Sequence, residues 1–219
     1  LCSRRAFPNK LLPEEFRHLH TRFIGRNMAY EDIIPSTNDL LKKMALQGAP
    51  DGTVCVAEEQ SVGKGRLARG WFSPYGKGLW FSLLLKPTFL PQEAPKMTLL
   101  AAVAVVRAVR ELCGVKAEIK WPNDILLEGR KLVGILTEMS AEFGHINYLV
   151  VGIGINVCVP QSMVPEALRE SAVSIDDVAE KPTDRVALLA KVSIIWRLAI
   201  ENGPQGRLWP ILDECAAIP

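Results

Sequence analysis

The sequence predicts an α+β fold, in which helices cover a mixed and largely antiparallel central sheet. Apolar runs of strand length cluster in the middle of the chain, and segments with the 3.6-residue apolar period of helices lie before, among and after them. The chain has 219 residues, of which 48% are hydrophobic and 23% are charged. That composition is typical of a globular protein and excludes a disordered, collagen-like or coiled-coil chain.

Three helices are expected in chain order. The first begins at Ser36, a favourable N-cap residue, and ends at Gly48. The second covers 96–112 and is apolar on most sides, which is typical of a buried helix. The third begins after Thr183 as its N-cap and continues to Asn202 with one apolar face.

Five strands are expected, because short apolar or β-branched runs are bounded by glycine, proline and polar residues. They lie at 53–57, 79–85, 117–121, 133–138 and 148–153. Between the third and the fourth, Glu128-Gly129 predicts a hairpin turn. The stretch 60–78 is rich in glycine and predicts a loop.

Charge and cysteine content narrow the function classes. The formal net charge is +2, so no overall field favours nucleic acid or an acidic membrane. Five scattered cysteines without a CxxC pair favour reduced thiols in a cytoplasmic protein over a disulfide framework or a zinc site. The uncharged run 146–165 carries asparagine, glycine and proline together, so we expect a buried strand and loop there and no membrane span.

The stretch Gly63-Lys-Gly-Arg-Leu-Ala-Arg-Gly-Trp71 is a candidate anion-binding loop. Its glycines let the backbone approach a ligand, and Lys64, Arg66 and Arg69 offer cationic donors for phosphate or carboxylate. It is neither a Walker A loop nor G-x-G-x-x-G, because Ala68 stands at the third glycine position. By spacing alone, a solvated basic loop explains the stretch equally well.

Three further stretches combine chemistry-bearing residues with strand ends. In Lys120-Trp-Pro-Asn-Asp124, the proline fixes the backbone before a carboxylate that suits a metal or a hydroxyl, although a plain turn also fits. In Gly129–Leu136, Lys131 enters an apolar strand and needs an anion, unless it lies at a hairpin edge. Glycines in Gly152-Ile-Gly-Ile-Asn156 indicate close approach of a ligand or of another backbone, although a close-packed sheet corner explains them equally well.

In their order along the chain, these stretches resemble the biotin protein ligases. The resemblance covers about 28–200, and its most specific blocks are Lys120-Trp-Pro-Asn-Asp124 and Arg130-Lys-Leu-Val-Gly-Ile-Leu136. Ser36-Thr-Asn38 and Gln60 occur at the places that the family pattern requires. One departure is Lys64, since the family usually has Gly-Arg-Gly-Arg here; the charge remains but bidentate geometry is lost.

The resemblance implies a biotin/lipoate ligase-like catalytic domain and a two-step reaction. Biotin and ATP, with Mg²⁺, would form biotinyl-5′-AMP and pyrophosphate, and a lysine of a biotin carboxyl carrier protein would then attack the adenylate. Fixed cations can offset the charge of such a reaction without a protein nucleophile. The implied location is cytoplasmic, a homodimer is one expected assembly, and DNA binding is expected only if a helix-turn-helix precedes this chain.

The resemblance also implies residue roles. The expected catalytic residues are Arg66, Lys131 and Asp124. The expected biotin-binding residues are Ser36, Thr37, Asn38, Gln60, Lys64, Gly65, Arg66, Lys131, Gly134, Gly152 and Gly154. The expected nucleotide-binding residues are Lys64, Arg66, Arg69, Trp71, Lys120, Asn123 and Asn156. Asp124 would either hold the metal or position Lys131, and the two roles stay open.

The same resemblance divides the chain into three parts. Residues 1–25 would be a lead-in or the remnant of a linker, 26–205 the catalytic domain, and 206–219 the start of a C-terminal β domain that is truncated or absent. Two alternative functions remain: a lipoate or octanoate ligase relative, which shares the catalytic fold, and a biotin-sensing repressor fragment without catalysis. Pyrophosphate release with each substrate separates all three.

Overall fold

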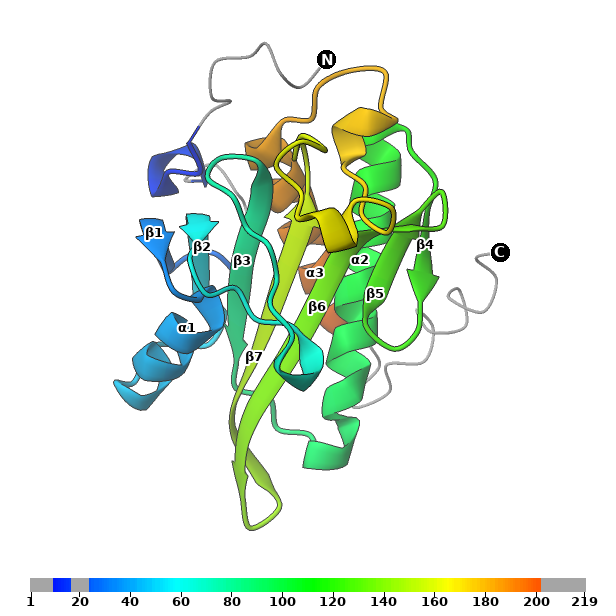
Figure 1. Cartoon of the computed structure of the whole chain (residues 1–219). Coiled ribbons are helices and arrows are strands. Elements are labelled where there is room, and N and C mark those ends of the chain that lie inside the picture. The colour runs from blue at the N-terminus through cyan, green and yellow to red at the C-terminus, as the bar shows by residue number, and fades with distance from the viewer. Residues whose placement is uncertain (1–9, 17–23, 202–219) are drawn as a thin grey trace.

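A computed structural model describes residues 10–16 and 24–201, which form one seven-stranded sheet with three α-helices (Figure 1). The strand order is β1-β2-β3-β7-β6-β5-β4, and β1 and β2 form the parallel pair while the neighbours from β2 onward are antiparallel. This confirms the α+β class and the largely antiparallel sheet. The strands are β1 (Met28–Ile34), β2 (Val54–Gln60), β3 (Gly78–Leu85), β4 (Ala117–Lys120), β5 (Asp124–Leu127), β6 (Arg130–Glu142) and β7 (His145–Asn156).

The two faces of the sheet carry different layers. Helices α2 (Ala94–Cys113) and α3 (Arg185–Glu201) lie behind the sheet in Figure 1. They pack on alternate strand residues such as Val54 and Val151, which belong to the main core cluster. Side chains alternate between faces along a strand, so the neighbouring residues point to the other face. That face stays free of these two helices and is available for a ligand.

Helix α1 (Thr37–Leu46) lies on this second face, at the β1-β2-β3 end of the sheet (Figure 1). Its Leu41 packs on Cys55, Leu84 and Val150, which alternate with the residues beneath α2 and α3. Ser36 is the N-cap as predicted, since its side chain accepts a hydrogen bond from the Asp39 N–H. The first two residues of α1 contact the middle of the sheet, since the Thr37 hydroxyl lies 2.7 Å from that of Ser82 on β3 and Asn38 lies against Gly152 on β7.

The structure differs from the sequence-based expectations in its strand set and at the starts of two helices. Strands β1 and β5 were not expected, and the Glu128-Gly129 turn joins β5 to β6 rather than joining the strands at 117–121 and 133–138 directly. Thr183 is not the N-cap of α3, because the Asp184 carboxylate accepts from the N–H groups of the next turn. Helix α2 also begins two residues earlier than expected, at Ala94.

The described residues before β1 are part of the packed domain. Leu11 and Ile24 lie in the main core cluster, although 1–25 was expected to be a lead-in. The expected C-terminal β segment at 206–219, and the expected helix end at Asn202, lie outside the described residues. Within the described ranges, no helix combines the length and the apolar character that crossing a membrane requires.

Candidate functional site

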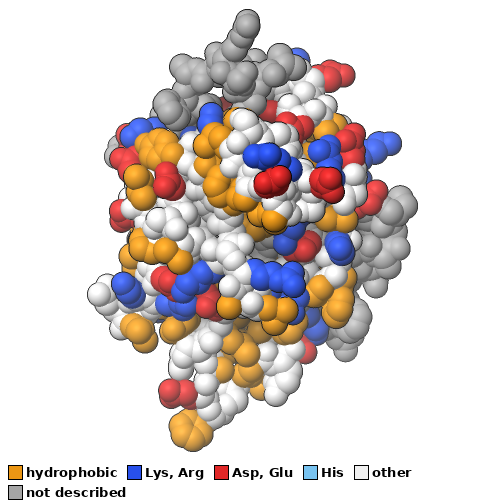
Figure 2. All heavy atoms as spheres, in the orientation of Figure 1, with side chains coloured by type: hydrophobic (Ala, Val, Ile, Leu, Met, Phe, Trp, Pro, Cys, Tyr) orange, Lys and Arg blue, Asp and Glu red, His pale blue; other side chains and the backbone are white. Residues whose placement is uncertain are grey.

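A cavity opens on the α1 side of the sheet, where the predicted stretches meet. The loop of residues 63–70, here called the basic loop, crosses above strands β6 and β7 (Figure 1). Figure 2 shows Lys and Arg side chains across the middle of this face, with Asp and Glu side chains beside them. The cavity is lined by Ser36, Thr37, Asn38, Gln60, Lys64, Gly65, Arg66, Trp71, Phe81, Asn123, Lys131, Gly134, Ile135, Leu136, Gly152, Ile153 and Gly154.

The polar end of the cavity is built around the N-terminus of α1. Gln60 Oε1 accepts hydrogen bonds from the Thr37 N–H at 3.0 Å and from its hydroxyl at 3.1 Å. The Thr37 hydroxyl also lies 2.7 Å from the hydroxyl of buried Ser82, which donates to Asn38 Oδ1 at 2.6 Å. Each hydroxyl has one proton, so the Thr37 hydroxyl donates either to Ser82 or to Gln60 while Ser82 donates to Asn38, and these contacts hold the three side chains in fixed orientations.

A charged cluster supports this end from outside. Asn38 Nδ2 donates to Glu138 at 2.8 Å, and Lys42 contacts both Glu138 and Asp39 at 2.8 Å. Asp39 also forms a salt bridge of 2.6 Å with Lys64 of the basic loop. Partial burial raises the pKa of Asp39, but the hydrogen bonds from Lys42 and Lys64 outweigh it and leave that pKa below its ordinary value. Asp39 therefore stays ionised between two lysines.

Three glycines form the floor, and the strand register explains why they must be glycines. Gly134 pairs with Gly154, and Gly152 lies two residues away from Gly154 on β7, opposite Leu136 and on the same face of the sheet. A Cβ at Gly152 would overlap the Asn38 side chain, whereas one at Gly154 would overlap the Trp71 indole. Because these glycines lack side chains, the Asn38 amide and the Trp71 indole can both pack directly on the backbone of the sheet.

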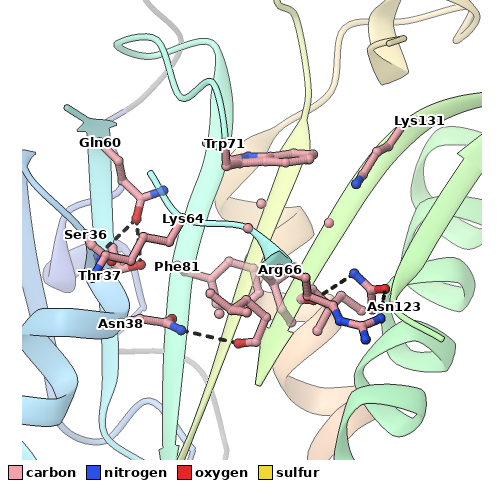
Figure 3. A pocket seen from close by; sticks show the side chains of 17 residues that line it. Ser36, Thr37, Asn38, Gln60, Lys64, Arg66, Trp71, Phe81, Asn123 and Lys131 are labelled. Atoms are coloured by element: carbon pink, nitrogen blue, oxygen red, sulfur yellow. Dashed lines mark hydrogen bonds between the residues drawn. The ribbon is translucent and has the colours of Figure 1, made fainter. Parts of the chain in front are cut away.

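Two cations of the basic loop, Lys64 and Arg66, reach opposite sides of the cavity. Figure 3 shows Lys64 on the Gln60 side and Arg66 beside Asn123. Arg66 Nη1 donates to Asn123 Oδ1 at 2.8 Å, and Asn123 is itself held by donating to Ile135 O and to Asp124. Both cations thus have protein partners, which their sequence positions did not reveal.

Lys131 faces the cavity from β6, across from Gln60 (Figure 3). Its Nζ forms a 2.9 Å salt bridge with Asp124 and lies 5.3 Å from the Trp71 ring centre. The anion that Lys131 was expected to need is therefore Asp124. In its described ranges the structure contains no group of three His, Cys, Asp or Glu side chains that could hold a metal ion.

Three residues expected to bind nucleotide do not line the cavity. Arg69 and Lys120 are exposed, and Asn156 is buried, donating from Nδ2 to Val173 O at 3.2 Å. Conversely, sequence reasoning missed four apolar lining residues, Phe81, Ile135, Leu136 and Ile153. Ile135, Leu136 and Ile153 lie inside blocks that the sequence did single out, whereas no local signal separates Phe81 from other residues of an apolar strand.

The cavity is nearly closed in this conformation. Its volume is about 40 Å³, whereas sites for small molecules span about 300–1,000 Å³. Trp71 and the basic loop occupy the space above the glycine floor. A ligand of ordinary size therefore requires these groups to move.

Comparison with known proteins places these features in one family. The model of the Biotin/lipoate A/B protein ligase family matches residues 30–156, which contain every lining residue of the cavity. The Bifunctional ligase/repressor BirA of Bacillus subtilis is 42% identical over 186 residues, which are 84% of this chain and 57% of that protein. The Biotin--[acetyl-CoA-carboxylase] ligase of Mycobacterium tuberculosis is 31% identical over 190 residues, 82% of this chain and 68% of that protein.

Solved structures give the same result. The biotin protein ligase of Aquifex aeolicus in complex with biotin and ATP matches with a TM-score of 0.74 and 28% identity, covering 87% of this chain and 77% of that one. The Leishmania major biotin protein ligase with biotinyl-5-AMP has a TM-score of 0.72 at 22% identity, and it shows the fold. The chain spans little more than half the length of the Bacillus subtilis relative.

Proposed function

The chain belongs to the biotin/lipoate A/B protein ligase family, and we propose that it activates biotin with ATP and transfers it to a lysine of a biotin carboxyl carrier protein. The observation that carries the proposal is the meeting of a polar end (Ser36, Thr37, Asn38 and Gln60) with three cations (Lys64, Arg66 and Lys131) in one cavity. The polar end suits a ligand head that both donates and accepts hydrogen bonds, and the cations suit a carboxylate joined to phosphate.

In the first step, an oxygen of the biotin carboxylate attacks the α-phosphorus of ATP. The bond to the bridging oxygen of the β-phosphate breaks, and pyrophosphate leaves. Two anions approach each other in this step, so Lys131 and Arg66 stabilise the negative charge on the phosphate oxygens. Asp124 holds the Lys131 ammonium at 2.9 Å and thereby fixes its position.

We assign the remaining residues in order, from the floor of the cavity to the residues outside it. Gly65, Gly134, Gly152 and Gly154 bring backbone against biotin. We assign Trp71 and Asn123 to the nucleotide, and Lys64, on the Gln60 side of the cavity, to both biotin and the nucleotide. Arg69 and Lys120 would reach the nucleotide from outside the closed cavity. Asn156 would act through the backbone carbonyl of Lys131, at the limit of hydrogen-bond distance (3.5 Å).

Mg²⁺ fits this site as part of the nucleotide substrate rather than as a resident ion. The described residues offer no cage of carboxylates, and Asp124 is occupied by Lys131. Magnesium commonly binds through substrate phosphates with few protein ligands. It would supply charge neutralisation on ATP, and the protein groups derived above do the positioning.

In the second step, the lysine amine of the carrier attacks the acyl carbon of the adenylate, an amide forms, and AMP leaves. Positioning the amine is then the main task. We further propose a cytoplasmic location and a homodimer. The Bacillus subtilis relative is named a ligase and a repressor, so DNA binding belongs to this protein if a helix-turn-helix precedes the chain.

The test is pyrophosphate release by the 219-residue chain with Mg-ATP and either biotin or lipoate, followed by mass spectrometry. We expect biotin-dependent release and a product with the mass of biotinyl-5′-AMP. Lipoate, whose dithiolane ring lacks amide donors and an amide acceptor, offers no hydrogen-bonding group to the polar end of the cavity and should react poorly. Release with lipoate alone would contradict the proposal, and biotin binding without release would identify a sensor instead.

A further inference from the structure

The basic loop is closed upon itself and carries backbone strain. Gly65 N–H donates to Arg69 O at 2.7 Å and Trp71 N–H to Gly63 O at 2.8 Å, so the loop forms a small hairpin. Leu67 and Ala68 have φ angles of 56° and 57°, values that residues with a side chain rarely adopt. Leu67 is also 84% exposed, so its own packing does not stabilise this conformation.

Two side-chain contacts tie this loop to the rest of the domain. Arg66 bonds to Asn123 on one side of the cavity, and Lys64 bonds to Asp39 on the other. Asp39 follows Asn38 directly, so the second contact joins the loop to the helix that builds the polar end. A cavity of about 40 Å³ lies between these two attachments.

We infer that Asp39 is a positioning residue that acts through Lys64: their salt bridge holds the basic loop closed and sets how fast it opens. Asp39 itself does not line the cavity. Its carboxylate is one-third exposed and Lys64 is 42% exposed, so the contact is strong enough to bias the loop and weak enough to break during turnover. The chain thus gives its atypical Lys64 a carboxylate partner.

The first test follows the loop without any ligand. Amide hydrogen exchange at Gly65 and Trp71 should be about threefold faster in Asp39→Asn and in Lys64→Met than in the wild type, as for the loss of one partly exposed ion pair. The double variant D39N/K64M should exchange no faster than either single variant. Glu111→Gln, which breaks the exposed Glu111–Lys191 pair of α2 and α3, is the matched control and should leave these amides unchanged.

This design separates the loop contact from helix stability. Asp39 lies in the first turn of α1, where a carboxylate also interacts with the helix N-terminus. Lys64→Met does not alter α1, so equal effects of the two single variants indicate the salt bridge. Two outcomes would overturn the inference. One is amide exchange in D39N that equals the wild-type rate. The other is that D39N accelerates exchange as much in the K64M background as it does in the wild type.

The second test uses biotin as the probe and rests on the proposed function. Because the closed loop blocks both entry and exit, D39N should speed association and dissociation of biotin by a similar factor, about threefold, and leave the dissociation constant within twofold. A residue that contacts biotin would change dissociation and affinity instead. Slower or unaltered association in D39N would contradict a closing role. If the wild-type chain binds no biotin, the proposed function fails, while the exchange experiment still decides the role of Asp39.

Discussion

At the scale of single residues, Lys131 has two neighbours that define its position. The Asp124 carboxylate balances its charge and the Trp71 ring covers one side, while 37% of the side chain remains exposed toward the cavity. A cation held in this way needs little rearrangement to stabilise charge that develops on a phosphate. The contacts of Lys131 with Asp124 and Trp71 should therefore affect the rate of adenylate formation.

Lys131→Met should lower the rate of pyrophosphate release about 10²–10³-fold, the usual cost of removing one preorganised charge contact. The melting temperature should change little, because the salt bridge is partly exposed. Lys116→Met, at an exposed lysine away from the cavity, is the control and should keep full activity. Near wild-type release by the Lys131 variant would remove this residue from the reaction.

Asp32 connects three parts of the chain, and its carboxylate should make the free energy of unfolding fall at acidic pH. It accepts hydrogen bonds from Tyr30, Lys10 and Tyr75, and these lower its pKa to about 2. The unfolded pKa is close to 3.8. The ionised Asp32 therefore contributes fully to the free energy of unfolding above about pH 4, and this contribution is lost as the pH falls toward 2.

Asp32→Asn should reduce the melting temperature at pH 7, and the difference from wild type should shrink between pH 4 and pH 2. Thermal melts of both proteins across this range measure the difference directly, and other carboxylates cancel in the comparison. A difference that stays constant down to pH 2 would show that the charge of Asp32 plays no part.

The site residues that could be predicted from sequence are those within short polar or basic stretches. Ser36, Gln60, Arg66 and Lys131 were expected and all line the cavity. Ser82 and Glu138 were not, because their partners lie 44 and 100 residues away in the sequence. Both partners are Asn38 of α1, so only the packing of this helix on the sheet brings these residues together, and a single sequence does not reveal it.

At the scale of elements, the expected helices and the longer strands were confirmed, and the errors have identifiable causes. In β1, Glu31 and Asp32 interrupt the apolar pattern, since this strand lies at the edge of the sheet with those residues exposed. Strand β5 has only four residues between two turns. Edge exposure and short length both weaken the periodic signal on which sequence reasoning depends.

The start of α3 offers a clean test of helix capping. Asp184→Ala removes the acceptor for the N–H groups of Val186 and Ala187 and should cost about 0.5–2 kcal/mol of unfolding free energy. Thr183→Ala is the informative neighbour, because the sequence alone favours Thr183 as the cap. Urea denaturation should show a larger loss of unfolding free energy for Asp184→Ala than for Thr183→Ala. The reverse order would indicate that Thr183 is the N-cap, as the sequence predicted.

At the scale of the whole molecule, one buried ion pair joins distant layers. Arg185 at the start of α3 and Glu58 of β2 are each 1% exposed and lie 2.7 Å apart. Arg185 also donates to Gly78 O, and Glu58 accepts from the Leu11 N–H. Helix, sheet and N-terminal segment thus share a single charged contact inside the core.

Arg185→Met should lower the unfolding free energy by about 3–5 kcal/mol, because it leaves the Glu58 carboxylate buried without its partner. The double variant E58Q/R185M should be less destabilised than R185M, since it removes the buried charge and keeps an oxygen for the Leu11 N–H. Urea unfolding of both variants measures this order. A double variant that is less stable than R185M would show that the ion pair is not the cause.

The attachment of Leu11 also gives the domain a mechanical property. Tension on the chain at Lys10 passes to β1 through Asp32 and to β2 through the Leu11 N–H and Glu58. Arg185 then joins Glu58 to α3, so the same contact also connects the N-terminal segment to that helix. Glu58 lies two residues before Gln60 on the same strand. A pull on the N-terminal segment is therefore transmitted to the backbone beside the polar end of the cavity.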